Sequence, residues 1–231
     1  VIAPANIAAD DVVFGMLRRG GGASILLVPS ASATREGLDD DWVAVHELSH
    51  LWLPRFYPQD RWLSEGVATY LQEVLRARCG LQTEARAWQR LLEGFARGRR
   101  SGTGRPLTLE SRDMDETGAY HRVYWAGAAF ALEADVWFRE TTDGRESLLD
   151  ALSSAQPVWG HSARPVTPEV FLKALGGADG SDFVEALGRE YQSRSEFPDE
   201  AYIAALELRA RRAKIMRPAQ SRCGLSDESH R

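Results

Sequence analysis

The sequence contains little cysteine, no long apolar run and only a small net charge. Its 231 residues include two cysteines, Cys79 and Cys223, which excludes a disulfide-rich scaffold. Two separate thiols are the simpler interpretation, and the alternative is a single bridge formed in an oxidising compartment. The longest apolar stretches, 23–28 and 126–132, are far shorter than the roughly 18 residues needed to cross a bilayer, so we expect no membrane span. The net charge of −5 argues against nucleic acid as the main partner, because such domains are usually basic.

A secretion signal is also missing from the start of the sequence. Val1-Ile2-Ala3-Pro4 lacks an initiator methionine, a basic region and an apolar core. We therefore expect any targeting segment to have been removed or to lie outside this sequence, which leaves a bacterial periplasm or exterior and a cytoplasm as alternatives. The residues that are present, 44% of them hydrophobic and seven of them Trp, are typical of a globular protein with a sizeable core.

Apolar runs bounded by turn residues predict strands only near the start of the chain, at 11–17 and 24–29 around a glycine turn. From Asp39 onward the apolar spacing is helical. The predicted helices begin at Asp39 and at Ser64, surround Trp88 to Phe95, and then cover 116–140, 146–155, 168–175, 181–191 and 198–215, with a Gly- and Arg-rich loop at 97–106. This pattern predicts a mostly helical α+β fold. Its parts are an N-terminal β region at 1–38, a helical core at 39–140 and a C-terminal helical part at 141–231.

The segment His46-Glu47-Leu48-Ser49-His50 lies within the first predicted helix and forms an H-E-x-x-H motif. Two histidines at positions i and i+4 project from one face of a helix, so both imidazoles can bind one zinc ion. Zinc lowers the pKa of water, and the Glu47 carboxylate can accept the proton that is released. The motif therefore predicts a hydrolytic zinc site. The alternative is a surface helix that carries two unrelated histidines.

A catalytic zinc site needs a third protein ligand and an open fourth position. Glu65 suits this role, because a turn over residues 54–60 would bring the start of the second helix near the two histidines. Taken alone, a glutamate at this position would be an acid that interacts favourably with the helix dipole. Together with the motif, it predicts a site for one Zn²⁺ ion with the ligands His46, His50 and Glu65.

These residues resemble the gluzincin metallopeptidases, in particular the catalytic domains of the aminopeptidase N and glycyl aminopeptidase families. Their pattern is H-E-x-x-H followed by W-x-x-E-G-x-x-x-Y, which residues 46–50 and 62–70 match. Residues 119–127 are similar to the families' Y-x-x-x-Y-x-x-G segment. The resemblance implies a thermolysin-like fold and hydrolysis of peptide bonds, with Glu47 as general base and Tyr124 as hydrogen-bond donor to the oxyanion. Without the zinc motif, Tyr120 and Tyr124 would be interpreted as core aromatics.

The chain also departs from these families in ways that leave its substrate open. The interval between His50 and Glu65 is shorter than in aminopeptidase N by about one helical turn of residues. Where the families place a glutamate that binds the substrate's amino group, residues 14–18 carry Leu17. Gly15, Met16 and Tyr120 are the substrate-binding residues that the resemblance implies. The expected partner is a peptide or protein substrate, cut internally or from its N-terminus, and the alternative function is an inactive module that binds zinc or peptide.

Overall fold

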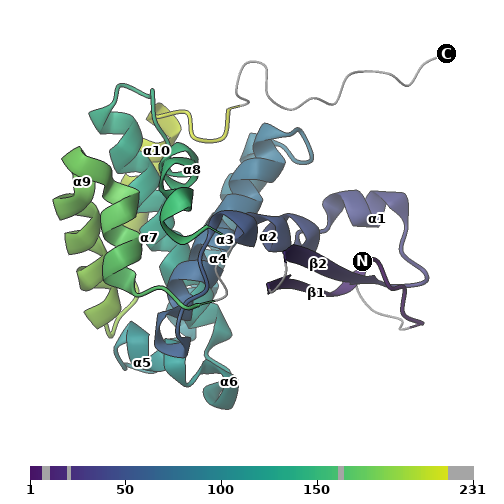
Figure 1. Cartoon of the computed structure of the whole chain (residues 1–231). Coiled ribbons are helices and arrows are strands. Elements are labelled where there is room, and N and C mark those ends of the chain that lie inside the picture. The colour runs from purple at the N-terminus through teal and green to yellow at the C-terminus, as the bar shows by residue number, and fades with distance from the viewer. Residues whose placement is uncertain (7–10, 20–21, 161–163, 218–231) are drawn as a thin grey trace.

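The computed structural model describes residues 1–6, 11–19, 22–160 and 164–217. Figure 1 shows a small two-stranded sheet and one short helix on one side of a larger helical body, so the predicted mostly helical α+β class is confirmed. Among the described residues, no helix is long and apolar enough to cross a membrane. The strands are β1 (Val12–Arg19) and β2 (Ala23–Pro29), and the helices are α1 (Arg35–Asp40), α2 (Val43–Ser49), α3 (Arg61–Arg78), α4 (Glu84–Arg100), α5 (Leu107–Arg112), α6 (Met114–Thr117), α7 (Tyr120–Thr141), α8 (Leu148–Trp159), α9 (Pro168–Ser193) and α10 (Glu200–Arg212).

The N-terminal region consists of the antiparallel β1–β2 pair followed by α1. Leu17 lies opposite Ile25, and the alternation of the strand leaves Phe14 and Met16 exposed on the same face of β1. The predicted β region at 1–38 is wrong in its last part, because α1 begins at Arg35. The Thr34 hydroxyl accepts the N–H of Gly37 at 3.0 Å and so provides the N-cap of this helix.

Two predicted helix starts are also wrong, and side-chain hydrogen bonds explain both. Asp39 belongs to α1, and α2 begins only at Val43, whose N–H donates to the Asp41 carboxylate at 2.6 Å. α3 begins at Arg61 rather than at Ser64. The Ser64 hydroxyl donates to the Arg61 carbonyl at 3.1 Å, so Ser64 lies inside the first turn and does not cap it.

Further along the chain, glycines account for where the helices continue and where they end. The predicted loop at 97–106 is helical as far as Arg100, and within this turn Gly98 leaves room for the ring of Phe197 and the Cβ atom of Trp125. The predicted helix over 116–140 is interrupted at Gly118, which has a φ of 72° and separates α6 from α7. α9 spans both helices predicted at 168–175 and 181–191, with a break in helical geometry at Gly177 between them.

The core is organised around α7, which contacts α3, α4, α8, α9 and α10. The crossing of α3 and α7 is unusually close because glycines meet there. A Cβ atom added to Gly127 would lie 2.0 Å from the Trp62 carbonyl oxygen, and one added to Gly66 would lie 2.2 Å from the Gly127 Cα atom. The two backbones are therefore in contact. This crossing brings the N-terminal part of α3, which carries Glu65, next to the N-terminal part of α7, which carries Tyr124.

Candidate metal site and cleft

The three predicted zinc ligands converge in the structure. His46 lies in α2, and His50 follows the last residue of that helix, where a 3₁₀ turn over His50–Trp52 begins. The two imidazole rings are 4.9 Å apart between centroids. The Oε2 atom of Glu65 lies 3.3 Å from Nε2 of His46 and 3.5 Å from Nε2 of His50. All three donor atoms thus face one another, although His50 lies outside the regular α-helix.

This spacing fits a tetrahedral metal site. Zinc binds imidazole nitrogen and carboxylate oxygen at about 2.0–2.2 Å, so neighbouring ligand atoms of a tetrahedron lie about 3.3–3.5 Å apart. The two distances from Glu65 Oε2 fall in that range. The donor set of two imidazoles and one carboxylate is also one that zinc uses in hydrolytic sites. His46, His50 and Glu65 are therefore suited to hold the ion.

The mutual charges of these groups shift their pKa values in opposite directions. Burial alone would raise the pKa of the Glu65 carboxyl, but the two histidines outweigh burial and hold this pKa well below its usual range. Burial alone would lower the pKa of His50, but the neighbouring Glu65 carboxylate outweighs it and raises this pKa. The site therefore stabilises the ionised carboxylate, which is the form that binds a metal.

Glu47 lies between the histidines and the strand β1. Ligand atoms of His46, Glu47 and His50 all lie within 4.8 Å of one another. The Oε2 atom of Glu47 accepts the N–H of Leu17 at 2.7 Å, so the backbone of β1 positions this carboxylate. Gly15 makes the close approach possible, because a Cβ atom there would lie 2.7 Å from Cγ of Glu47.

The two candidate tyrosines of α7 have different surroundings. The ring of Tyr124 stacks on that of His46 with the centroids 6.1 Å apart, and its phenol lies near the Glu65 carboxylate. Burial, followed by the Glu65 charge, raises the pKa of Tyr124 well above its usual value, so the phenol keeps its proton and can donate it. Tyr120 is 42% exposed and donates to Asp115 at 3.2 Å.

An open cleft of about 1470 Å³ contains the ligands and Glu47. Gly15 and Met16 line it along β1, and Tyr124 lines it from α7. Tyr120 is not among its lining residues. The cleft is therefore bounded by the strand on one side and by the α3–α7 pair on the other.

Two residues that the sequence analysis did not single out contact the predicted ligands. Arg19, at the end of β1, donates to the backbone carbonyls of His50 and Leu53 and so ties the strand to the turn that carries a ligand. Gln72 in α3 lies 2.9 Å from Nδ1 of His46 through its Oε1 atom. It follows Glu65 by seven positions, which is two helical turns, and this spacing is the signal that would have indicated it. Cys223, the second cysteine of the sequence, lies outside the described residues.

A scan against protein-family models and a search of curated proteins found no match for this chain. A functional assignment therefore depends on the residues and geometry of the cleft.

Proposed function

We propose that the chain is a zinc-dependent metallopeptidase with a thermolysin-like catalytic domain whose zinc-binding core lies within residues 39–140. The observation that carries this proposal is the convergence of Nε2 of His46 and Nε2 of His50 on Oε2 of Glu65, at 3.3 and 3.5 Å, with the Glu47 carboxylate beside them. Two imidazoles and a carboxylate hold the metal, and a second carboxylate is left for proton transfer. A purely structural zinc site would not need this second carboxylate.

Zinc, when bound by His46, His50 and Glu65, supplies a Lewis acid that polarises the peptide carbonyl and lowers the pKa of water. Glu47 accepts a proton from the attacking water while the oxygen atom of that water bonds to the carbonyl carbon. The same carboxyl then delivers the proton to the leaving nitrogen as the C–N bond breaks, which gives a carboxylate and an amine. The hydrogen bond from Leu17 N–H holds Glu47 in place for both transfers.

Tyr124 suits the role of oxyanion donor. Its ring stacks on that of His46, so it lies at the ligand cluster, and its raised pKa keeps it protonated. A donor fixed at the place where negative charge develops stabilises the transition state more than the substrate. In this proposal Tyr124 contacts the reacting atoms, whereas Tyr120 does not.

One observation favours a second function, a module that binds zinc and peptides without cutting them. The Leu17 N–H already occupies Oε2 of Glu47 at 2.7 Å, so this oxygen is engaged by the backbone of β1 and is less available to a water molecule. The two functions differ in the fate of a bound peptide, so one experiment separates them.

The test compares the protein with Glu47→Gln on a mixed peptide set, half of it with blocked N-termini, read by mass spectrometry, and measures zinc content in parallel. Glu47→Gln should retain about one zinc and lose cleavage. The matched control is Glu116→Gln, an exposed carboxyl in α6, which should cleave like the parent. Cleavage of blocked peptides would indicate internal cutting. Bound zinc without cleavage in the parent protein would favour the binding module, and absence of zinc binding would reject both functions.

A further inference from the structure

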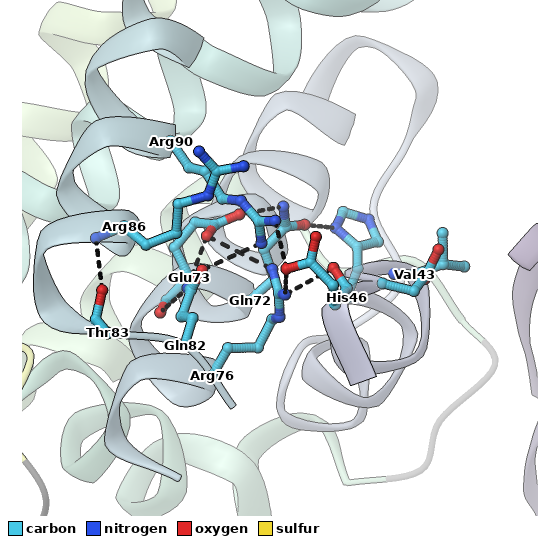
Figure 2. A network of polar contacts seen from close by, with 11 residues as sticks. Val43, His46, Gln72, Glu73, Arg76, Gln82, Thr83, Arg86 and Arg90 are labelled. Atoms are coloured by element: carbon cyan, nitrogen blue, oxygen red, sulfur yellow. Dashed lines mark hydrogen bonds and ion pairs between the residues drawn. The ribbon is translucent and has the colours of Figure 1, made fainter. Parts of the chain in front are cut away.

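A buried polar chain extends from His46 into the protein interior. Figure 2 shows the amide of Gln72 between the ring of His46 and the carboxylate of Glu73. Oε1 of Gln72 lies 2.9 Å from Nδ1 of His46, and Nε2 of Gln72 donates to Oε1 of Glu73 at 2.9 Å. The exposed fractions of His46, Gln72 and Glu73 are 4%, 5% and 2%, so water does not compete for these bonds.

The chemistry of the three groups fixes the direction of every hydrogen bond. A carboxylate only accepts, so the amide nitrogen of Gln72 must face Glu73. The amide oxygen then faces His46, and because a carbonyl oxygen also only accepts, Nδ1 of His46 must carry the proton. In the neutral ring, Nε2 then keeps its lone pair, and this is the tautomer that binds a metal through Nε2. Without a metal ion, the Glu65 carboxylate 3.3 Å from Nε2 is an acceptor that competes for a proton on this atom.

Glu73 is itself held in place from several sides. Nε2 of Gln82 donates to Oε2 of Glu73 at 2.9 Å and to its backbone carbonyl at 3.0 Å. Nη1 of Arg76, a residue with no exposed surface, lies 3.8 Å from Oε2, and Nη2 of the same residue donates to the Asp40 carbonyl at 2.8 Å. Arg90 closes the network by donating to Gln82 at 3.1 Å and to Asp40 at 2.8 Å. The carboxylate therefore cannot turn away from Gln72.

We propose that Glu73 is a positioning residue that fixes the tautomer and ring orientation of His46 by holding the Gln72 amide in one orientation. The inference rests on the proposed function in so far as His46 binds zinc. If the amide were reversed, its N–H₂ group would face Nδ1, the ring proton would move to Nε2, and the metal-binding lone pair would be lost. The competing explanation is that Glu73 serves only to balance the buried charge of Arg76.

The first measurement needs no variant. Long-range ¹H–¹⁵N NMR on the metal-free protein, at a pH where His46 is neutral, reports which ring nitrogen carries the proton. We expect a proton on Nδ1, and a ring that carries its proton on Nε2 alone would overturn the proposal. The result does not depend on zinc binding, so the tautomer can be as expected while zinc fails to bind, or the reverse. Failure of the inference is thereby distinguished from failure of the proposed function.

The second measurement uses Glu73→Gln and the double variant Gln72→Glu/Glu73→Gln, with zinc affinity measured by chelator competition. Loss of a group that orients a metal ligand lowers metal affinity by about 10–100-fold, and we expect this drop together with mixed His46 tautomers in Glu73→Gln. The double variant should restore both, because a carboxylate at position 72 accepts through either oxygen and needs no orienting partner. An unchanged tautomer in Glu73→Gln, or failure of the double variant to restore it, would show that Glu73 only balances Arg76.

Gln72→Met provides a variant that leaves the Glu73–Arg76 pair intact. It removes the acceptor for Nδ1 of His46 while keeping a side chain of similar length. We expect the same mixed tautomers and a zinc affinity lowered to the same extent as in Glu73→Gln. A fully Nδ1-protonated His46 in Gln72→Met would contradict the proposal even if Glu73→Gln did not fold.

Discussion

The two walls of the cleft both depend on glycine, but in different ways. At the α3–α7 crossing, a Cβ atom on Gly127 would lie 2.0 Å from a backbone oxygen. At the contact between β1 and α2, a Cβ atom on Gly15 would lie 2.5 Å from Cγ1 of Val43 and 2.7 Å from Cγ of Glu47, both of which are side-chain atoms. A backbone cannot yield without moving a helix, whereas a side chain can change its torsion angles. The helical wall is therefore the rigid one, and the strand wall is adjustable.

This difference matches the division of tasks in the proposed site. In the proposed site, the rigid wall carries the ligand Glu65, the oxyanion donor Tyr124 and the Gln72–Glu73 pair that orients His46. The adjustable wall contacts Glu47 through Leu17 N–H, so it positions the group that moves a proton. Four predictions test this comparison, ordered by the expected loss of unfolding free energy.

The largest effect is expected for Gly127→Ala. The new methyl group would overlap the Trp62 carbonyl, and α3 and α7 would have to separate. Overpacking of a tight core costs about 1–3 kcal/mol, and a clash with backbone should reach the upper end, so we expect a loss of about 3 kcal/mol. Urea unfolding measures it. Gly102→Ala is the control, because its Cβ atom would have no neighbour closer than 3.7 Å, and we expect a change within about 0.5 kcal/mol.

Equal unfolding midpoints for Gly127→Ala and Gly102→Ala would contradict the close crossing of α3 and α7. A large loss in Gly127→Ala accompanied by unchanged zinc affinity would show that the crossing stabilises the fold without setting the position of Glu65.

The second-largest effect is expected for Arg19, whose hydrogen bonds link the strand wall to the turn that begins at His50. Arg19→Met keeps the apolar stem of the side chain but removes two hydrogen bonds from the guanidinium to the carbonyls of His50 and Leu53. Bonds from charged donors contribute about 1.5–3 kcal/mol, and this partly buried pair should account for about 2 kcal/mol together. Hydrogen exchange should also become faster in β1. The neighbouring exposed residue provides the control Arg18→Met, and equal losses in both variants would indicate that Arg19 is not a specific tie.

The third effect is a pH dependence of the free energy of unfolding that comes from Asp60, the residue before α3. Burial and then the Glu169 charge raise the pKa of Asp60 from 3.8 to about 6. The folded state therefore binds more protons than the unfolded state between these values, and the free energy of unfolding should fall as pH rises from about 4 to 6. We expect a loss of about 1–2 kcal/mol in this window, less than the full shift would give, because Asp60 lines a small open pocket. Asp60→Asn should flatten this part of the stability curve, and an unchanged slope would refute the assignment.

The convergence of the three proposed metal ligands could be predicted from the sequence because each position depends on short-range geometry. His46 and His50 are one helical turn apart, and Glu65 is placed by a single short connection. The first residues of the helices were harder to predict, because several neighbouring residues can serve as the N-cap. Asp39, Asp40 and Asp41 can all cap a helix, and only the structure shows that the first two belong to α1.

Contacts between residues far apart in the sequence were harder still to predict. Tyr120 and Tyr124 lie one turn apart on the same helix, so both lie on the same face of it. Which of them reaches Glu65 depends on how far α7 is shifted along α3, and the spacing does not show this shift. Gln72 was hidden in a similar way. Its spacing from Glu65 indicates the face of α3 on which it lies, but its partners at His46 and Glu73 come from the tertiary structure and the spacing does not show them.

The smallest loss of stability, with a clear functional effect, is expected for Gly15→Ala. Its methyl group would meet side-chain atoms of Val43 and Glu47, which can move aside, so we expect a loss below about 1 kcal/mol and unchanged zinc content. The displaced Glu47 should transfer protons less well, and cleavage should slow by about 10–100-fold, since misplacement of a catalytic group by about 1 Å can have effects of this size. Urea unfolding and cleavage rates, with Gly102→Ala alongside, give both values. If Gly15→Ala destabilised the protein as much as Gly127→Ala, the two walls would be equally rigid; if it cleaved like the parent, the strand would not position the base.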